Sequence, residues 1–127
     1  MSVEHINPPG LSRQATYSHV VKAGNTIYVA GQVARDENGR VVGPGDFTAQ
    51  AIQVFENLGK ALAAAGADFR NLVKITIYLT DPRYREALGK VRTQYIKDPV
   101  PASTLVVVAG LAEPDYLLEI EAIAVVE

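Results

Sequence analysis

The sequence predicts an α+β fold in which two helices pack on one face of a mixed β-sheet, in the order β-β-β-α-β-α-β-β. One segment has apolar residues at helical spacing, one alternates strictly between apolar and polar residues, and β-rich runs occur near both ends. One sheet with two helices is the simplest way to bury these apolar faces in a single domain, residues 1–127. The other sheet face still carries Leu, Ile and Val side chains, so we expect oligomerisation to cover it.

Composition excludes several classes of protein. Apolar residues make up 48% of the 127 and charged residues 20%, which is typical of a soluble globular protein. The absence of cysteine excludes disulfides, thiolate nucleophiles and zinc fingers. A net charge of −2 without a Lys/Arg cluster argues against nucleic-acid binding. The apolar runs are too short for a membrane span, and residues 1–5 lack the features of a signal peptide, so we expect a cytoplasmic protein.

Turn signals predict two hairpins in the first third of the chain. Residues 18–21 and 26–30 flank the Ala-Gly-Asn turn at 23–25 and form the first hairpin. The Asn-Gly pair at 38–39 is the strongest short turn signal in the sequence and lies between two short apolar runs. We therefore expect a second, smaller hairpin there.

Asp46 is suited to cap a first helix, which ends before Gly66. Its apolar positions alternate steps of four and three residues: Ala51, Phe55, Leu58, Leu62 and Ala65. Residues 73–79 alternate apolar with polar side chains, as in a strand with one buried face.

A second helix is predicted to begin at Asp81-Pro82, a cap followed by a proline in the first turn. Its apolar stripe is Tyr84, Leu88, Val91 and Tyr95. Asp98-Pro99 ends it, and the β-rich runs 103–108 and 117–126 complete the sheet.

Two glutamates lie on the last predicted strand. Glu119 and Glu121 are two residues apart, so their side chains point to one face of the sheet, which also carries Ile123 and Val125. A half-buried carboxylate among apolar side chains is suited to orient water or to act as a general base. The alternative is a solvated face, or salt bridges across an edge strand.

Two further positions are candidates for ligand contact. Gly31, before Gln32, interrupts a strand and would allow a ligand or a neighbouring group to approach closely, although a β-bulge explains it equally well. Ser103 and Thr104 open a strand with two hydroxyls, a pattern that is also common without function.

Other chemistries lack support in the sequence. His5 and His19 are fourteen positions apart and have no clustered carboxylates, so we expect no metal site. We expect His19 to be a surface or interface residue whose hydrogen bonds are satisfied. No nucleophile elbow or phosphate-binding glycine motif occurs, and we expect no cofactor.

Taken in order, five segments resemble the Rid/YjgF family, which includes the enamine/imine deaminases and proteins historically labelled endoribonuclease L-PSP. The match covers nearly the whole chain. The segments are residues 30–33, 50–66, 73–81, 101–102 and 119–124. The resemblance implies a chorismate-mutase-like fold and a homotrimer whose sheets pack into a central barrel, with a small-molecule ligand bound between subunits.

In the deaminase branch of that family, a glutamate on the last strand positions the hydrolytic water, and an N-terminal tyrosine closes the pocket. The resemblance assigns these roles to Glu119 and Tyr17. The same branch holds the substrate carboxylate with an arginine at the position of Ser103, and commonly has asparagine at that of Gly89. These departures affect the substrate anchor, because serine offers one neutral hydrogen bond where guanidinium offers a charged, bidentate fork.

Another cation could replace the missing arginine. Arg13, in the segment leading to Tyr17, is the nearest candidate in sequence, and Arg92 on the second helix is another. For both, the alternative is an ordinary solvated arginine.

The function that these residues indicate is hydrolysis of small reactive imines or enamines, with a substrate other than the usual 2-iminocarboxylate. Glu119 would orient the water, and Tyr17, Gly31, Gln32, Ser103, Thr104 and Arg13 would shape the site. The alternative is a homologue that binds a small metabolite without turning it over.

Overall fold

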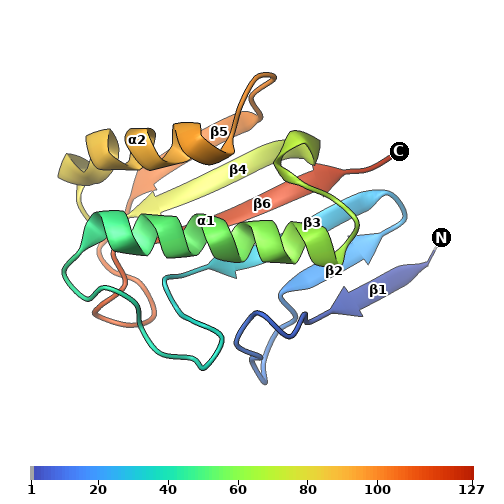
Figure 1. The fold of residues 1–127 in the computed structure, drawn as a ribbon, viewed down its shortest axis with the longest axis horizontal. Coiled ribbons are helices and arrows are strands. Elements are labelled where there is room, and N and C mark those ends of the chain that lie inside the picture. Colours follow the sequence, from blue (N-terminus) through green and yellow to red (C-terminus); the bar gives the residue numbers. More distant parts are fainter. Residues whose placement is uncertain (1) are drawn as a thin grey trace.

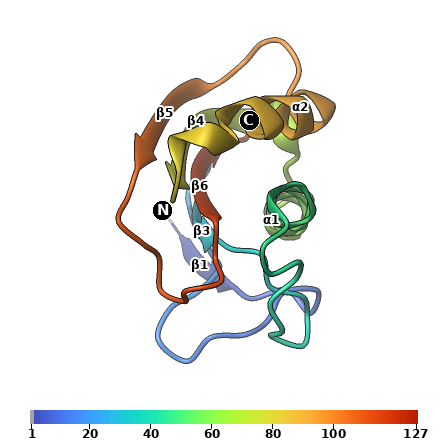
Figure 2. The same ribbon diagram turned by 90° about the vertical axis from the view of Figure 1, so that its left-hand side faces the viewer.

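A computed structural model describes residues 2–127; Met1, at the start of the N-terminal segment considered above, lies outside the description. Within that range a six-stranded sheet carries two α-helices on one face, which confirms the predicted α+β architecture (Figures 1 and 2). The strands are β1 Val3–Ile6, β2 Val20–Ala23, β3 Thr26–Gln32, β4 Leu72–Leu79, β5 Ala102–Val107 and β6 Leu118–Val125. The helices are α1 Phe47–Ala64 and α2 Arg85–Tyr95, with short 3-10 turns η1 Phe69–Asn71 and η2 Pro82–Tyr84.

The last strand of the chain lies in the middle of the sheet. The spatial order is β1-β2-β3-β6-β4-β5, so β6 joins the N-terminal strands to the second half of the fold. β4 and β5 run parallel, and the other neighbours are antiparallel. β6 therefore has backbone contacts with both halves of the fold.

One predicted strand was assigned to the wrong segment. The second hairpin is reduced to an isolated bridge between Arg35 and Val41, and the third N-terminal strand is instead β1, at the sheet edge. The Asp36 side chain accepts hydrogen bonds from the backbone of Asn38 and Arg40, which closes the turn tightly. Gly43, with φ +56°, then turns the chain toward α1 before a ladder can form.

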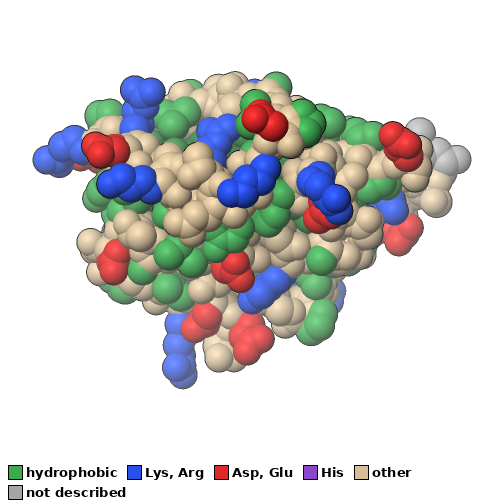
Figure 3. Space-filling model, turned by 45° about the horizontal axis from the view of Figure 1, so that its top comes forward, with side chains coloured by type: hydrophobic (Ala, Val, Ile, Leu, Met, Phe, Trp, Pro, Cys, Tyr) green, Lys and Arg blue, Asp and Glu red, His purple; other side chains and the backbone are tan. Residues whose placement is uncertain are grey.

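The two helices begin and end close to where the sequence predicts. Asp46 caps α1 by accepting a hydrogen bond from the backbone of Ala49, and Asp81 caps η2, which leads into α2. The apolar face of α1 lies on the sheet, and the rings of Phe55 and Tyr95 stack 5.1 Å apart between the helices. On the surface that Figure 3 shows, Lys and Arg side chains are interspersed with Asp, Glu and apolar ones.

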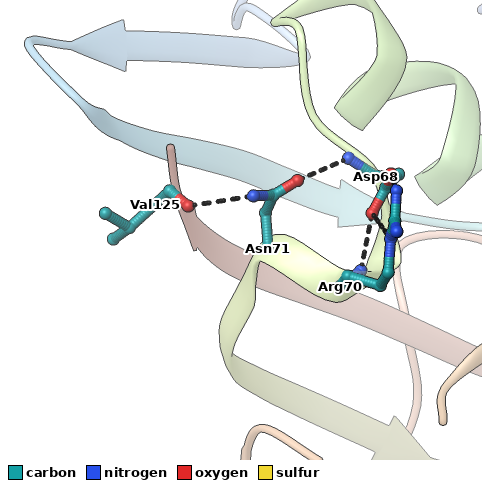
Figure 4. Close-up of polar contacts among 4 residues, drawn as sticks. All are labelled: Asp68, Arg70, Asn71 and Val125. Carbon is teal, nitrogen blue, oxygen red and sulfur yellow. Dashed lines mark hydrogen bonds and ion pairs between the residues drawn. The ribbon is translucent and has the colours of Figure 1, made fainter. Parts of the chain in front are cut away.

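A small polar cluster fixes the link between α1 and β4 (Figure 4). The Asp68 carboxylate accepts hydrogen bonds from the backbone and guanidinium of Arg70, and the Asn71 side chain accepts one from the backbone of Asp68. Asn71 also donates to the carbonyl of Val125 at 3.3 Å. The start of β4 is thereby tied to the end of β6, the strand that carries Glu119.

The sheet face opposite the helices is exposed in the single chain. Tyr28 on β3, Val106 on β5 and Val125 on β6 are 49%, 39% and 40% exposed. The predicted apolar face without a cover is therefore present. No helix in residues 2–127 is both long and apolar enough to cross a membrane.

Candidate functional site

A cavity of about 550 Å³ opens where β3 and β6 meet the loop before β2 and the loop before β6. Its polar and charged lining residues are Ser12, Gln14, Tyr17, His19, Gln32, Arg35, Asn57, Glu113, Tyr116 and Glu119. Gly31 also lines it. Four of the predicted site residues, Glu119, Tyr17, Gly31 and Gln32, therefore lie around one space.

Gly31 makes room for the carboxylate of Glu119. The β3–β6 register shifts between Val29 and Gln32, which is the bulge considered as an alternative for Gly31. A Cβ at Gly31 would overlap Oε2 of Glu119 and would lie 2.7 Å from its Cδ. The bulge and the close approach are both present, and the group that approaches is the Glu119 side chain.

The environment of Glu119 disfavours its charged form. Burial, and secondly the nearby charge of Glu121, raise the pKa of the Glu119 carboxyl above its usual value of 4.5. Glu121 itself lies outside the cavity and accepts a hydrogen bond from Tyr78. Within residues 2–127, no side chain or backbone donor is bonded to the Glu119 carboxylate, so its oxygens can accept a hydrogen bond from water or a ligand.

Tyr17 lies over the same space with its ring edge-on to His19, 5.6 Å between centroids. Burial raises the pKa of the Tyr17 hydroxyl, the positive charge of Arg35 lowers it, and the Glu119 charge raises it further. Arg35, Glu119 and Tyr17 therefore share one electrostatic environment, and Tyr17 keeps its proton and can donate a hydrogen bond at neutral pH.

His19 is buried within the single chain, and both of its ring nitrogens have hydrogen-bond partners, as expected of a satisfied residue. Its Nε2 lies 2.6 Å from the carbonyl of Ser12, and its Nδ1 lies 3.1 Å from the amide nitrogen of Gln32. A carbonyl can only accept and an amide nitrogen can only donate, so we assign the neutral ring with hydrogen on Nε2. Gln32 also donates to the carbonyl of Ala30, so this wall of the cavity is fixed.

Arg35 is the cation that the structure brings to the cavity and that sequence analysis missed. Its Nε donates to the hydroxyl of Tyr116 at 2.7 Å, and one terminal nitrogen lies 4.0 Å from Glu113. Gly31, Gln32 and Val33 are consecutive residues that also line the cavity, so no alternating pattern in the sequence distinguishes Arg35.

Two buried amides of α1 hold the walls in place. Asn57 donates to the carbonyls of Val33 and Arg35 at 3.1 and 2.9 Å. Gln50 donates to the carbonyl of Asp115 at 2.7 Å and accepts from the backbone of Leu117 at 2.9 Å. The first fixes the segment that carries Arg35, and the second fixes the loop that leads to β6.

Replacing Asn57 with leucine should lower the free energy of unfolding by about 1–3 kcal/mol, because two partly buried carbonyls lose their donor. The measurement is chemical denaturation followed by circular dichroism. Gln94→Leu makes a comparable polar-to-apolar change at an exposed position of α2, and should change stability by less than about 0.5 kcal/mol. Equal effects of the two variants would contradict the role given to Asn57.

The remaining predicted residues do not line the cavity of the single chain. Arg13 is exposed, while its neighbours Ser12 and Gln14 line the wall. Ser103 and Thr104 lie on β5, separated from β6 by β4, and Thr104 accepts a hydrogen bond from Lys74. Arg92 lies on α2 and is likewise absent from the cavity.

Comparison with known proteins places these features in a family. The fold and site define a small α+β protein with the chorismate-mutase-like fold and a polar cavity beside its central strand. A family model described as Endoribonuclease L-PSP matches residues 10–126, and the chain belongs to this family, also known as YjgF/Rid.

Relatives and solved structures agree with that assignment. A RutC family protein of Pyrococcus horikoshii is 38% identical over 108 residues, which are 85% of each chain. A 2-iminobutanoate/2-iminopropanoate deaminase of Mus musculus is 38% identical over 109 residues, covering 86% of this chain and 80% of that protein. RidA from an Antarctic Psychrobacter superposes with a TM-score of 0.91 at 34% identity, over 97% of this chain and 99% of that one. The expected resemblance is confirmed, and deaminase activity is supported at the level of the family.

Proposed function

We propose that this protein hydrolyses small reactive imines or enamines to carbonyl compounds, with a water molecule positioned by Glu119. The observation that carries the proposal is the Glu119 carboxylate, half-buried in the cavity, packed on Gly31 and free of protein donors within the described residues. Relatives named as imine deaminases support the same reaction type.

In the proposed reaction, water adds to the carbon of the C=N bond, and Glu119 takes one proton of the water and passes it to the nitrogen, which gives a neutral carbinolamine. Glu119 then takes the proton of the new hydroxyl group and passes it to the nitrogen as the C–N bond breaks, so that ammonia leaves and a carbonyl group forms. An imine and one water are thus converted to a carbonyl compound and ammonia, without redox change. Imines are reactive electrophiles, so positioning and one general base suffice.

We further propose that the protein acts as a homotrimer with ligand clefts between subunits. The exposed apolar face of the sheet supports this assembly. Ser103 and Thr104 lie far from Glu119 in the sheet order, so they would reach a cleft from a neighbouring copy. Because Ser103 is uncharged, the proposal requires either a substrate without the usual 2-iminocarboxylate group or a cation elsewhere in the site.

The test is hydrolysis of 2-iminopropanoate and 2-iminobutanoate, generated in situ by an amino-acid oxidase, by the wild type and by Ser103→Arg. We expect the wild type to accelerate hydrolysis and the variant to be faster, because it adds a charged anchor. If neither protein exceeds the rate without enzyme with these two imines or with their neutral amides, the hydrolase proposal fails.

Ser103 also favours a second candidate function, binding of a small metabolite without turnover. A thermal-shift screen of keto acids, amino acids and neutral metabolites separates the two, because a ligand specific to the folded protein raises the melting temperature. A stabilising ligand without hydrolysis of any imine would favour the binding protein.

Proposed catalysis by Glu119 also predicts the pH dependence. The ionised carboxylate is the active form, so activity should be lost as pH falls through the pKa of Glu119, which lies above 4.5. Glu121→Gln removes a nearby negative charge and should move the acidic limb of the kcat profile to lower pH. A shift to higher pH would contradict the assignment of this limb to Glu119.

A further inference from the structure

The cavity contains a cationic group whose geometry is fixed from several sides. The Nε of Arg35 donates to the Tyr116 hydroxyl at 2.7 Å, and the guanidinium carbon lies 5.6 Å from the centre of that ring. The backbone nitrogen of Arg35 donates to Val33 at 2.8 Å, and its carbonyl accepts from Asn57 at 2.9 Å. The side chain is 26% exposed, and it is anchored at both backbone and head group.

Most of the donor capacity of Arg35 is unused. A guanidinium has five N–H donors, and the hydrogen bonds of residues 2–127 account for one of them, at Nε. Glu113 approaches a terminal nitrogen only to 4.0 Å, and its side chain is 53% exposed, so it neutralises the charge weakly. A cation that lines a cavity and keeps its terminal donors is suited to bind a carboxylate through two parallel hydrogen bonds.

The same cavity places this cation near the proposed reaction centre. Arg35, Glu119 and Tyr17 all line it, and Arg35 is close enough to influence the Tyr17 hydroxyl. A substrate held at one end by Arg35 would present its other end to the wall formed by Gly31 and Glu119.

We propose that Arg35, oriented by Tyr116, is the residue of this cavity that binds the anionic group of a ligand. The role of the anion anchor in catalysis rests on the proposed function, whereas the binding of a carboxylate does not. Arg35 and Tyr116 are 81 residues apart and meet only in the folded chain. Tyr116 is a positioning residue, since it acts through Arg35.

The test measures binding separately from turnover. Isothermal titration calorimetry compares pyruvate with its neutral amide, pyruvamide, for the wild type, Arg35→Met and Tyr116→Phe. Arg35→Met should lower the ratio of pyruvate to pyruvamide affinity about tenfold to a hundredfold, because a hydrogen-bonded charge is lost. Tyr116→Phe should lower it less. Arg40→Met, an exposed arginine outside the cavity, is the matched control and should leave the ratio unchanged.

Kinetics with 2-iminopropanoate and its amide distinguishes the two proposals. We expect Tyr116→Phe to raise KM for the acid while kcat stays nearly the same, which a general loss of structure would not produce. An unchanged pyruvate preference in Arg35→Met, or its loss in Arg13→Met instead, overturns the anchor. If Arg35→Met loses the preference but the wild type hydrolyses no imine, the anchor stands and the hydrolase proposal fails.

Discussion

Glu119→Gln is expected to lower kcat for imine hydrolysis by about a hundredfold or more, the usual contribution of a general base. The amide has nearly the same size and keeps the contact with Gly31, but it cannot take a proton from water. Steady-state kcat with an imine generated in situ is the measurement, at a pH well above the raised pKa of Glu119. The melting temperature should change little.

Glu121→Gln is the matched control for this variant. Glu121 lies two residues further along β6, points to the same sheet face and does not line the cavity. At that pH its replacement should leave kcat unchanged, because Glu119 is then ionised in both proteins. A comparable loss of kcat in both variants would contradict the assignment of Glu119 as the general base.

The elements that the sequence predicts best are those with a local signal. Asp46 and the stripe from Ala51 to Ala65 mark α1 because capping and helical periodicity act over a few residues. β1 carries no such signal: it is four residues long, largely exposed, and forms only because β2 offers it an edge. The Asn38-Gly39 turn formed, but the glycines that follow redirect the chain before a strand is built.

The residues of the candidate site also differ in how well the sequence predicts them. The family resemblance predicted Glu119 and Tyr17, and the glycine within a predicted strand indicated Gly31. Arg35 was missed because its partner Tyr116 is 81 residues away, and no local pattern reports that contact. Arg13 was a candidate because it is close to Tyr17 in sequence, but its side chain is exposed and does not line the cavity.

Gly31→Ala is expected to abolish most of the activity and to lower the free energy of unfolding by about 1–3 kcal/mol, the usual cost of overpacking. The added methyl would overlap the Glu119 carboxylate, so either the carboxylate or the bulge must move. Gly31 is not among the glycines with positive φ, so alanine can adopt its backbone conformation, and the contact with Glu119 is the cause of the loss. Both kcat and denaturation report the effect.

Gly89→Ala makes the same chemical change inside α2, where an added Cβ meets no atom within 4 Å. It should stabilise the protein by about 0.5–1 kcal/mol, because alanine is favoured over glycine in helices. The decisive comparison is Gly31→Ala in a Glu119→Ala background, where the clashing carboxylate is absent and the stability cost of the methyl should largely disappear. The same cost in both backgrounds would mean that the strain lies in the bulge, and that Gly31 does not position the carboxylate.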